Sequence, residues 1–400
     1  MKKVLIFSLA YFPKHVGGAE VAIKEITDRI DDVEFHVLTN RFDSTLPKME
    51  RLGNVWVHRI GVTTLNPSMA DLKRFPLVLN KPLFQFWAVW HAVLLHRVHH
   101  FDATWAMMAH STGVPAAMFK IFFPRVKYIL NLQEGDPPEY IEVKMRPLWP
   151  LFRRAFTAAD VVQPLSTFLA TWARRMGYRG RIEVIPNAVD TERFHAVSQK
   201  EIEVAQQKCN LSEGSVMLLT TSRLVQKNAV DDVIRAMPYI DPRVTFVVAG
   251  TGPDEAMLRA LAEEMGVAER VRFIGNIEQE HIPAYVHAAD VFIRPSRSEG
   301  FGISFVEAMA AGIPVIATQE GGIADFLFDE KRNPGKQTTG WAVDKNAPDQ
   351  IAAAVRDILA RPEKVKEVVE TARMMVIEKY DWKVIARTMR EKVFTPLLGV

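Results

Sequence analysis

The chain has 400 residues, of which 48% are hydrophobic and 24% are charged, and its formal net charge is +3 at pH 7. This length exceeds what one hydrophobic core usually organises, so two domains are expected. The composition excludes disordered and fibrous classes, and the dispersed charge lacks the basic stripe typical of nucleic-acid binding. A single cysteine, Cys209, excludes an intrachain disulfide and fits a reducing compartment.

The amino terminus resembles a signal peptide only superficially. Two lysines precede the apolar run 4–9, but no small-residue cleavage site follows it, and a buried first strand is the better interpretation. The most apolar later stretch, 83–95, contains Gln85 and His91 and is too short to span a bilayer. A cytoplasmic protein is therefore expected, with peripheral attachment to the inner face of a membrane left open.

In the first third of the chain, short β-rich runs alternate with helical patterns. This alternation predicts an α/β domain whose parallel sheet carries helices on both faces. Strands are expected at residues 4–7, 34–38, 55–60, 103–107 and 127–131, with helices at 19–30 and between the last two strands.

A second α/β set begins after residue 213. Strands are expected at residues 216–220, 244–250, 271–274, 291–293 and 315–317, with a helix at 229–237 and an amphipathic terminal helix at 382–394. The segment 185–190 and the polar stretch to about residue 210 separate the two sets, so we place one domain at 1–195 and the other at 196–380. Parallel sheets bind ligands beyond the carboxyl ends of their strands, so chemistry is expected in the loops that follow strands.

The most specific local pattern is the string from Glu299 to Glu307, which follows the strand 291–293. Its glycines permit close approach of the backbone to a ligand. A helix that starts near Ile303 would direct its first amides and its dipole at a phosphate. Glu299 precedes this helix and Glu307 lies about one turn inside it, so one acid can face a transferred group while the other reaches a ribose hydroxyl. The plainer alternative is an ordinary loop with a glutamate salt bridge.

Two cations follow the strand 216–220, at Arg223 and Lys227. Converging there, they could neutralise a diphosphate leaving group. An arginine and a lysine at this spacing are more often part of a solvated face, but their place between a strand and a helix favours a site.

Two weaker signals lie in the first domain. Gly17 and Gly18 come at the start of the first expected helix, where exposed amides suit a phosphate or a sugar hydroxyl, although a plain loop is an equal alternative. His110 follows the strand 103–107 and could hydrogen-bond a sugar hydroxyl, while a structural histidine is the commoner case.

No metal site is expected. No Asp-x-Asp motif lies in a loop after a strand, and Asp231 and Asp232 open a helix, where acids favour the dipole. The histidines of the segment 96–100 are interpreted as an exposed helix end. We therefore expect neither a metal nor a bound cofactor, only a co-substrate.

Taken together, these motifs resemble the retaining glycosyltransferases of the family 4 type, and the likeness extends over nearly the whole chain. It rests on the Gly17-Gly18 loop, on the run 184–190, on Arg223 with Lys227, and on the string that ends at Glu307. It also includes 250–252, 273–275, 312–317 and 321–322. Gln133-Glu134 depart from the pattern, because many members have a histidine there.

The resemblance implies the GT-B fold, in which two Rossmann-like domains face each other across a cleft and a terminal helix, here 381–400, crosses back to the first domain. It implies a metal-independent, hexosyltransferase-type enzyme that takes a sugar from a UDP-, GDP- or ADP-sugar and retains its anomeric configuration. The acceptor would be a glycan or a lipid-linked molecule. The enzyme would act in the synthesis of cell-envelope or exopolysaccharide glycans.

The resemblance also assigns roles to residues. Arg223 and Lys227 would bind the donor diphosphate, Glu307 the ribose, and His110 the sugar hydroxyls. Glu299 would hold the transferred sugar together with the amides of Phe301 and Gly302. The remaining donor contacts would be the glycines and amides of Gly17, Gly18, Gly250, Ile277, Ile303 and Ser304.

The first domain should bind the acceptor, and one of its segments is unusual. Between residues 73 and 95, Lys73, Arg74 and Lys81 precede Phe84, Phe86, Trp87 and Trp90. Aromatic beside basic side chains suit an anionic lipid surface, but a buried helix of a large domain is slightly favoured. A nucleotide-sugar epimerase of the same fold and a non-catalytic nucleotide-sugar binding module remain as alternative functions.

Overall fold

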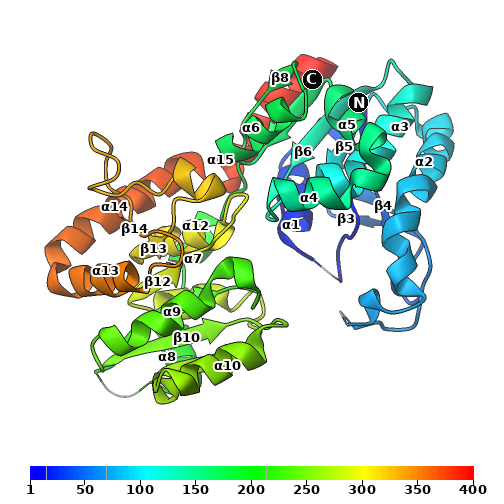
Figure 1. Cartoon of the computed structure of the whole chain (residues 1–400). Helices are drawn as coiled ribbons and strands as arrows, with labels where there is room; N and C mark the ends of the chain where they lie inside the picture. Colours follow the sequence, from blue (N-terminus) through cyan, green and yellow to red (C-terminus); the bar gives the residue numbers. More distant parts are fainter. Residues whose placement is uncertain (15, 69, 212–213) are drawn as a thin grey trace. The chain divides into compact units, whose positions relative to one another are not determined.

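The computed structural model describes residues 1–14, 16–68, 70–211 and 214–400, and they form two compact units (Figure 1). The first unit comprises Met1–Asn187 and Trp382–Val400, and the second comprises Ala188–Asp381. The sequence placed the domain limits at 195 and 380. The segment after Asn187 groups with the second unit because Val189 pairs with Asp381 and the Thr191 hydroxyl donates to the Asp381 carboxylate at 2.6 Å.

The first unit is built on an eight-stranded sheet with the order β3-β4-β2-β1-β5-β6-β7-β8. All neighbours are parallel except the edge strand β3, which runs antiparallel to β4. The strands are β1 Lys2–Phe7, β2 Val33–Asn40, β3 Met49–Leu52, β4 Val55–Ile60, β5 Ala103–Met107, β6 Lys127–Leu132, β7 Val161–Pro164 and β8 Arg181–Ile182. The five expected strands are confirmed, while β3, β7 and β8 were not predicted.

Helices cover this sheet on both faces. They are α1 Gly18–Thr27, α2 Asn80–His99, α3 Val114–Phe122, α4 Pro138–Lys144, α5 Trp149–Thr157, α6 Thr167–Arg175, and at the carboxyl end α15 Trp382–Met389 and α16 Thr395–Leu398. The expected return of the terminal helix to the first unit is confirmed. Phe394 is fully buried, and its ring lies 5.7 Å from that of Phe35 and 5.8 Å from that of Trp105.

The helix α2, which contains most of the segment 73–95, has one buried face and one exposed face. Phe84 is fully buried, so one face of α2 belongs to the core. The opposite face carries Phe86, Trp90, Leu94 and Val98 at a spacing of four residues, and their exposed fractions run from 41% to 72%. No helix of the described residues is both long and apolar enough to cross a membrane.

The second unit has a six-stranded, wholly parallel sheet with the order β11-β10-β9-β12-β13-β14. The strands are β9 Val216–Thr221, β10 Val244–Ala249, β11 Val271–Gly275, β12 Val291–Arg294, β13 Val315–Ala317 and β14 Trp341–Ala342. The helices are α7 Thr191–His195, α8 Gln199–Lys208, α9 Val230–Ala236, α10 Glu255–Glu264, α11 Ile282–His287, α12 Ile303–Ala310, α13 Pro348–Ala360 and α14 Pro362–Lys379.

Each sheet has one point where the chain reverses its winding direction. In the second unit the chain moves outward from β9 to β11 and then restarts at β12 on the other side of β9. In the first unit the same reversal falls between β1 and β5. The loops at such a point diverge and open a crevice beyond the carboxyl ends of the strands. The expected α/β class with two Rossmann-like units is confirmed, and the two reversal points are where each unit can hold a ligand.

Candidate functional site

The loop after β12 turns sharply into α12 at the reversal point of the second unit. Gly302 caps the helix with a left-handed φ of 94°, and a Cβ atom there would lie 2.5 Å from the Phe305 ring. Only glycine fits this turn. The helix begins at Ile303, as predicted, and the Oγ atom of Ser304 is buried with no hydrogen-bond partner among the described residues. The first amides of α12 and this hydroxyl suit an anion.

Glu299 is held in place by an arginine that sequence analysis did not identify. The Nη2 atom of Arg294 donates to Oε2 of Glu299 at 2.8 Å, and Arg294 is only 7% exposed. The same guanidinium donates to Oγ of Ser296 and lies 4.4 Å from the centroid of the Phe305 ring. Burial lowers the pKa of Arg294, and the charge of Glu299 opposes this effect. The available signal was a charged residue that ends an apolar strand.

Two glycines pack directly against the backbone of the loop that carries Glu299. A Cβ atom on Gly321 would lie 1.9 Å from the carbonyl oxygen of Glu299, and one on Gly322 would lie 2.1 Å from that of Gly300. The amide of Gly322 also donates to the Glu299 carbonyl at 3.0 Å. The pair 321–322 therefore belongs to the site because it permits close packing beneath Glu299.

Phe301 and Glu307 have different surroundings. The Phe301 ring is buried against Phe326 and Tyr380, at 5.3 Å and 5.6 Å between centroids, so only its backbone can face a ligand. Glu307 is half-buried on α12, and burial raises the pKa of its carboxyl to about 7, against the opposing charges of Arg193 and Arg294. Its ionisation state therefore changes near neutral pH.

The loop after β9 brings the two predicted cations to the same reversal point. Arg223 is exposed and Lys227 is half-buried. The side chain of Asn228 closes the loop by donating to the Arg223 carbonyl at 2.6 Å, and Ala229 adopts a left-handed φ of 54°. Asn228 thus has a structural role in this loop.

Arg297 joins the loops after β9 and β12, and sequence analysis missed it. Its amide donates to the Lys227 carbonyl at 2.7 Å, and its guanidinium donates to Asp231 and Asp232. The interpretation of the two aspartates as helix-dipole residues was therefore incomplete, because they also hold Arg297. The loop bearing Lys227 and the loop bearing Glu299 are positioned as one assembly.

Gly250 and Ile277 follow the neighbouring strands. A Cβ atom on Gly250 would lie 1.9 Å from the Ser222 carbonyl oxygen, and the Gly250 amide donates to the Gly275 carbonyl at 2.7 Å. Gly250 thus packs one loop on the next and uses its amide within the protein. Ile277 is half-buried just beyond β11.

His110 lies at the reversal point of the first unit, directly after β5. Met108 takes a left-handed φ of 72°, and this turns the amide of Ala109 onto Oε1 of Glu134 at 2.6 Å. The Nδ1 atom of His110 lies 3.5 Å from the same oxygen, and Glu134 is 2% exposed. No hydrogen bond to Nδ1 is formed at this distance among the described residues. Glu134 therefore orients the loop that carries His110.

Gly17 of the glycine pair is used differently from what was expected. The Gly17 amide donates to Oε2 of Glu20 at 2.7 Å, so it is engaged within the protein rather than offered to a ligand. Burial raises the pKa of Glu20. The helix α1 starts at Gly18, as the position of the pair predicted.

In the part of the chain that the structure describes, none of these residues belongs to a group that could hold a metal. Among the described residues, two such groups occur, His36 with His58 and His99, and the exposed trio Glu278, Glu280 and His281. The interpretation of 96–100 as an exposed helix end was wrong for two of its members. His96 packs 4.3 Å from the Phe123 ring, and His99 contacts His36 at 4.5 Å, both between ring centroids.

Two family-wide sequence profiles match the two parts of the chain. Residues 16–193 match the profile described as Glycosyltransferase Family 4, and residues 201–375 match that described as Glycosyl transferases group 1. The chain belongs to the family 4 glycosyltransferases. The matched ranges contain every predicted site residue.

Individual relatives agree with this membership. A GDP-mannose-dependent alpha-(1-6)-phosphatidylinositol monomannoside mannosyltransferase of Mycobacterium tuberculosis is 32% identical over 252 residues, 60% of this chain and 63% of the relative. A 2-deoxystreptamine glucosyltransferase of Streptomyces kanamyceticus is 28% identical over 73% of this chain and 74% of the relative. The chain thus spans less than two thirds of the mannosyltransferase it matches.

The fold is shared with structures of low sequence identity. A sucrose-phosphate synthase from Thermosynechococcus elongatus aligns over 100% of both chains with a TM-score of 0.80 and 19% identity. HepE of Anabaena, solved in complex with UDP and glucose, aligns over 98% of this chain and 99% of its own with a TM-score of 0.76 and 21% identity. At these identities the likeness establishes the fold.

The packing of Gly321 beneath Glu299 predicts a selective loss of ligand binding. Gly321 and Gly335 both have left-handed φ values, 59° and 87°, but only Gly321 has a neighbour within 4 Å of its Cβ position. Backbone strain should cost each alanine variant about 1–2 kcal/mol of stability, and Gly321→Ala should lose more because its Cβ would also clash with the Glu299 carbonyl. Only Gly321→Ala should weaken nucleotide binding, by at least tenfold, in isothermal calorimetry. Equal affinity in the two variants would show that the loop position does not depend on this contact.

Proposed function

We propose that this chain is a retaining, metal-independent glycosyltransferase that moves a hexose from a nucleoside diphosphate sugar to a glycan or lipid-linked acceptor. The observation that carries the proposal is the fixed carboxylate of Glu299, held by buried Arg294 just before the first amides of α12. The loop with Arg223 and Lys227 is tied to this assembly by Arg297. The acid that would bind the sugar, and the helix end and two cations that would bind the diphosphate, thus lie at one reversal point.

In this proposal, the second unit acts mainly by stabilising charge. Breaking the bond between the anomeric carbon and the diphosphate places negative charge on the leaving oxygen. Arg223, Lys227 and the amides of Ile303 and Ser304 would stabilise that charge, and preorganised donors of this kind supply a large part of enzymatic rate enhancement. The leaving phosphate would accept the proton of the acceptor hydroxyl, on the same face that the acceptor attacks, so the configuration is retained.

The names of relatives support the donor class. The mycobacterial relative is GDP-mannose-dependent, and the Anabaena structure holds UDP and glucose. A GDP- or UDP-hexose is accordingly the proposed donor. The lipid-linked acceptor named for the mycobacterial relative agrees with a role in cell-envelope or exopolysaccharide synthesis.

The test is a thermal-shift panel of UDP, GDP, ADP and their hexoses, with and without EDTA. One nucleotide should raise the melting temperature through mass action, unchanged by EDTA, and Lys227→Ala should abolish the rise. Lys331→Ala, in the exposed part of the 330–336 loop, serves as the control.

Donor hydrolysis in the same samples distinguishes the alternatives. Release of free hexose supports a transferase. Binding without release favours a non-catalytic binding module, and conversion of the bound sugar to its epimer favours an epimerase. The absence of any shift for every nucleotide would contradict the diphosphate site itself.

The raised pKa of Glu307 predicts that donor affinity depends on pH. The ionised carboxyl can accept hydrogen bonds from both ribose hydroxyls, whereas the acid form gives up one acceptor. With a pKa of about 7, affinity should rise roughly tenfold between pH 6 and pH 8 and then level off. The unliganded protein has the opposite dependence: because the folded pKa exceeds the ordinary 4.5, stability present below 4.5 is lost as the pH rises to about 7.

The measurement uses the intact nucleotide sugar, because its diphosphate diester keeps a constant charge over this range. Calorimetric affinities at pH 6, 7 and 8 should rise for the unmodified protein and stay flat and low for Glu307→Gln. A pH profile that survives in Glu307→Gln would assign the dependence to another group.

We also propose that the acceptor side of the first unit docks on an anionic membrane. Phe75, Phe86, Trp90 and Leu94 are exposed on or beside α2, as are Ile121 and Phe122 of the packed helix α3. Lys73, Arg74 and Lys81 are exposed at the start of the same segment. Exposed apolar patches edged by polar residues mark interaction sites, and cations beside aromatic groups favour anionic lipid.

Flotation with liposomes containing phosphatidylglycerol tests this docking. The unmodified protein should float with these vesicles and stay behind with neutral ones, and Trp90→Ser should lose most of the bound fraction. Tyr239→Ser is the matched control, because Tyr239 is also 65% exposed but lies in the second unit. Unchanged flotation of Trp90→Ser would contradict docking through α2.

A further inference from the structure

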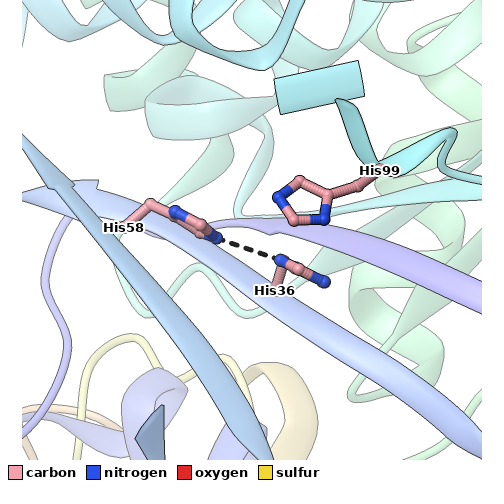
Figure 2. Close-up of side chains that lie close together, drawn as sticks. All are labelled: His36, His58 and His99. Atoms are coloured by element: carbon pink, nitrogen blue, oxygen red, sulfur yellow. Dashed lines mark hydrogen bonds between the residues drawn. The ribbon is translucent and has the colours of Figure 1, made fainter. Parts of the chain in front are cut away.

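Three histidines from three elements meet on the α2-covered face of the first unit's sheet (Figure 2). His36 lies in the middle of β2, His58 lies in β4, and His99 is the last residue of α2. The strand register pairs Leu38 with His58, so His58 and His36 point to the same side of the sheet. His36 is 1% exposed and His58 is 8% exposed. None of the three histidines is among the residues assigned to sugar transfer.

The nitrogen atoms of the cluster converge. The Nδ1 atom of His36 lies 3.0 Å from the Nε2 atom of His58, and their rings are stacked at an interplanar angle of 8°. The His99 ring lies over this pair, 4.5 Å from the His36 centroid and 6.0 Å from the His58 centroid. One ring nitrogen of each residue lies within 4.8 Å of the other two.

A carboxylate fixes the orientation of the central ring. Oε1 of Glu34 lies 2.8 Å from Nε2 of His36 and also receives Lys3 at 3.0 Å. An ionised carboxylate only accepts, so Nε2 of His36 donates the proton and its Nδ1 lone pair points into the cluster. Metal-binding histidines are usually held in this way, by a carboxylate on the nitrogen away from the ion.

We propose that His36, His58 and His99 form a three-nitrogen site for a divalent transition-metal ion of the zinc class. Zinc takes imidazole nitrogens at about 2.0–2.1 Å, which places tetrahedral ligand atoms about 3.3 Å apart. The His36–His58 pair is already near this spacing, and His99 closes the triangle by a small movement of its ring. A water would fill the fourth position. Imidazole ligands favour zinc, copper and nickel over calcium and magnesium.

The ion would have a structural role. His99 ends α2, and His36 and His58 lie inside the sheet rather than in loops at its carboxyl edge. A bound ion would fasten the end of α2 to β2 and β4, and so fix the helix that carries the exposed apolar face described above. Binding should therefore raise the stability of the first unit and leave donor affinity, which rests mainly on residues of the second unit, unchanged.

The experiment uses the full chain without a histidine tag, stripped of metal and titrated with Co²⁺, whose visible absorption reports nitrogen coordination. One equivalent of Co²⁺ should give a tetrahedral-type spectrum that one equivalent of Zn²⁺ abolishes. His99→Gln should weaken the binding of Co²⁺ by more than tenfold. The control is His281→Gln, in the exposed trio with Glu278 and Glu280, which should bind like the unmodified protein.

Hydrogen exchange gives a second readout that does not depend on a variant. Zinc should slow exchange in the last turn of α2 and in β2 and β4, and not in the 278–281 segment. The inference is overturned if the unmodified protein binds no stoichiometric Co²⁺, if His99→Gln binds as well as the unmodified protein, or if binding is lost only in His281→Gln. The cluster would then be a hydrogen-bonded core set.

Discussion

The buried ion pair between Arg294 and Glu299 is the interaction on which the candidate donor site depends. Arg294 ends β12 and is enclosed by Ser296, the Phe305 ring and the carbonyl of Thr221. A charge removed from water in this way needs a partner with good geometry, since leaving it unpaired costs several kcal/mol, about 3–5 in comparable cases. Glu299 supplies that partner and is thereby fixed in front of α12. The positions of the loop amides follow from the same constraint.

The surrounding loops reinforce this arrangement by close backbone packing. Gly321 and Gly322 allow the chain after β13 to lie against Glu299 and Gly300, and Gly250 allows the chain after β10 to lie against Ser222. Arg297 then links the loop after β12 to the loop after β9. Several glycines of the family pattern are thus explained by contacts between loops. Each loop of the site is thus held by its neighbour.

Strands with a continuous apolar pattern could be predicted from the sequence. Side-chain roles that depend on partners elsewhere in the chain could not. The apolar runs of β1, β2, β9 and β10 are buried on both faces, so they can be read without knowing the topology. The edge strand β3 alternates exposed and half-buried residues and has only four of them, too little for its pattern to be distinctive. Arg294 and Glu134 were missed as site residues because their roles come from partners 5 and 25 residues away that meet only in the fold. The histidine cluster was missed for the same reason, because residues 36, 58 and 99 are far apart in the sequence and meet only in the fold.

Retention of configuration is the part of the account that chemistry can test most directly. The anomer released when water replaces the acceptor can be followed by proton NMR, using the α-linked nucleotide hexose that the protein binds, with EDTA present. The account predicts that the α-anomer of the free hexose appears first and the β-anomer only later, as the two equilibrate. Initial release of the β-anomer would contradict a retaining transferase, and release that requires a divalent metal would contradict stabilisation of the leaving group by Arg223, Lys227 and the α12 amides.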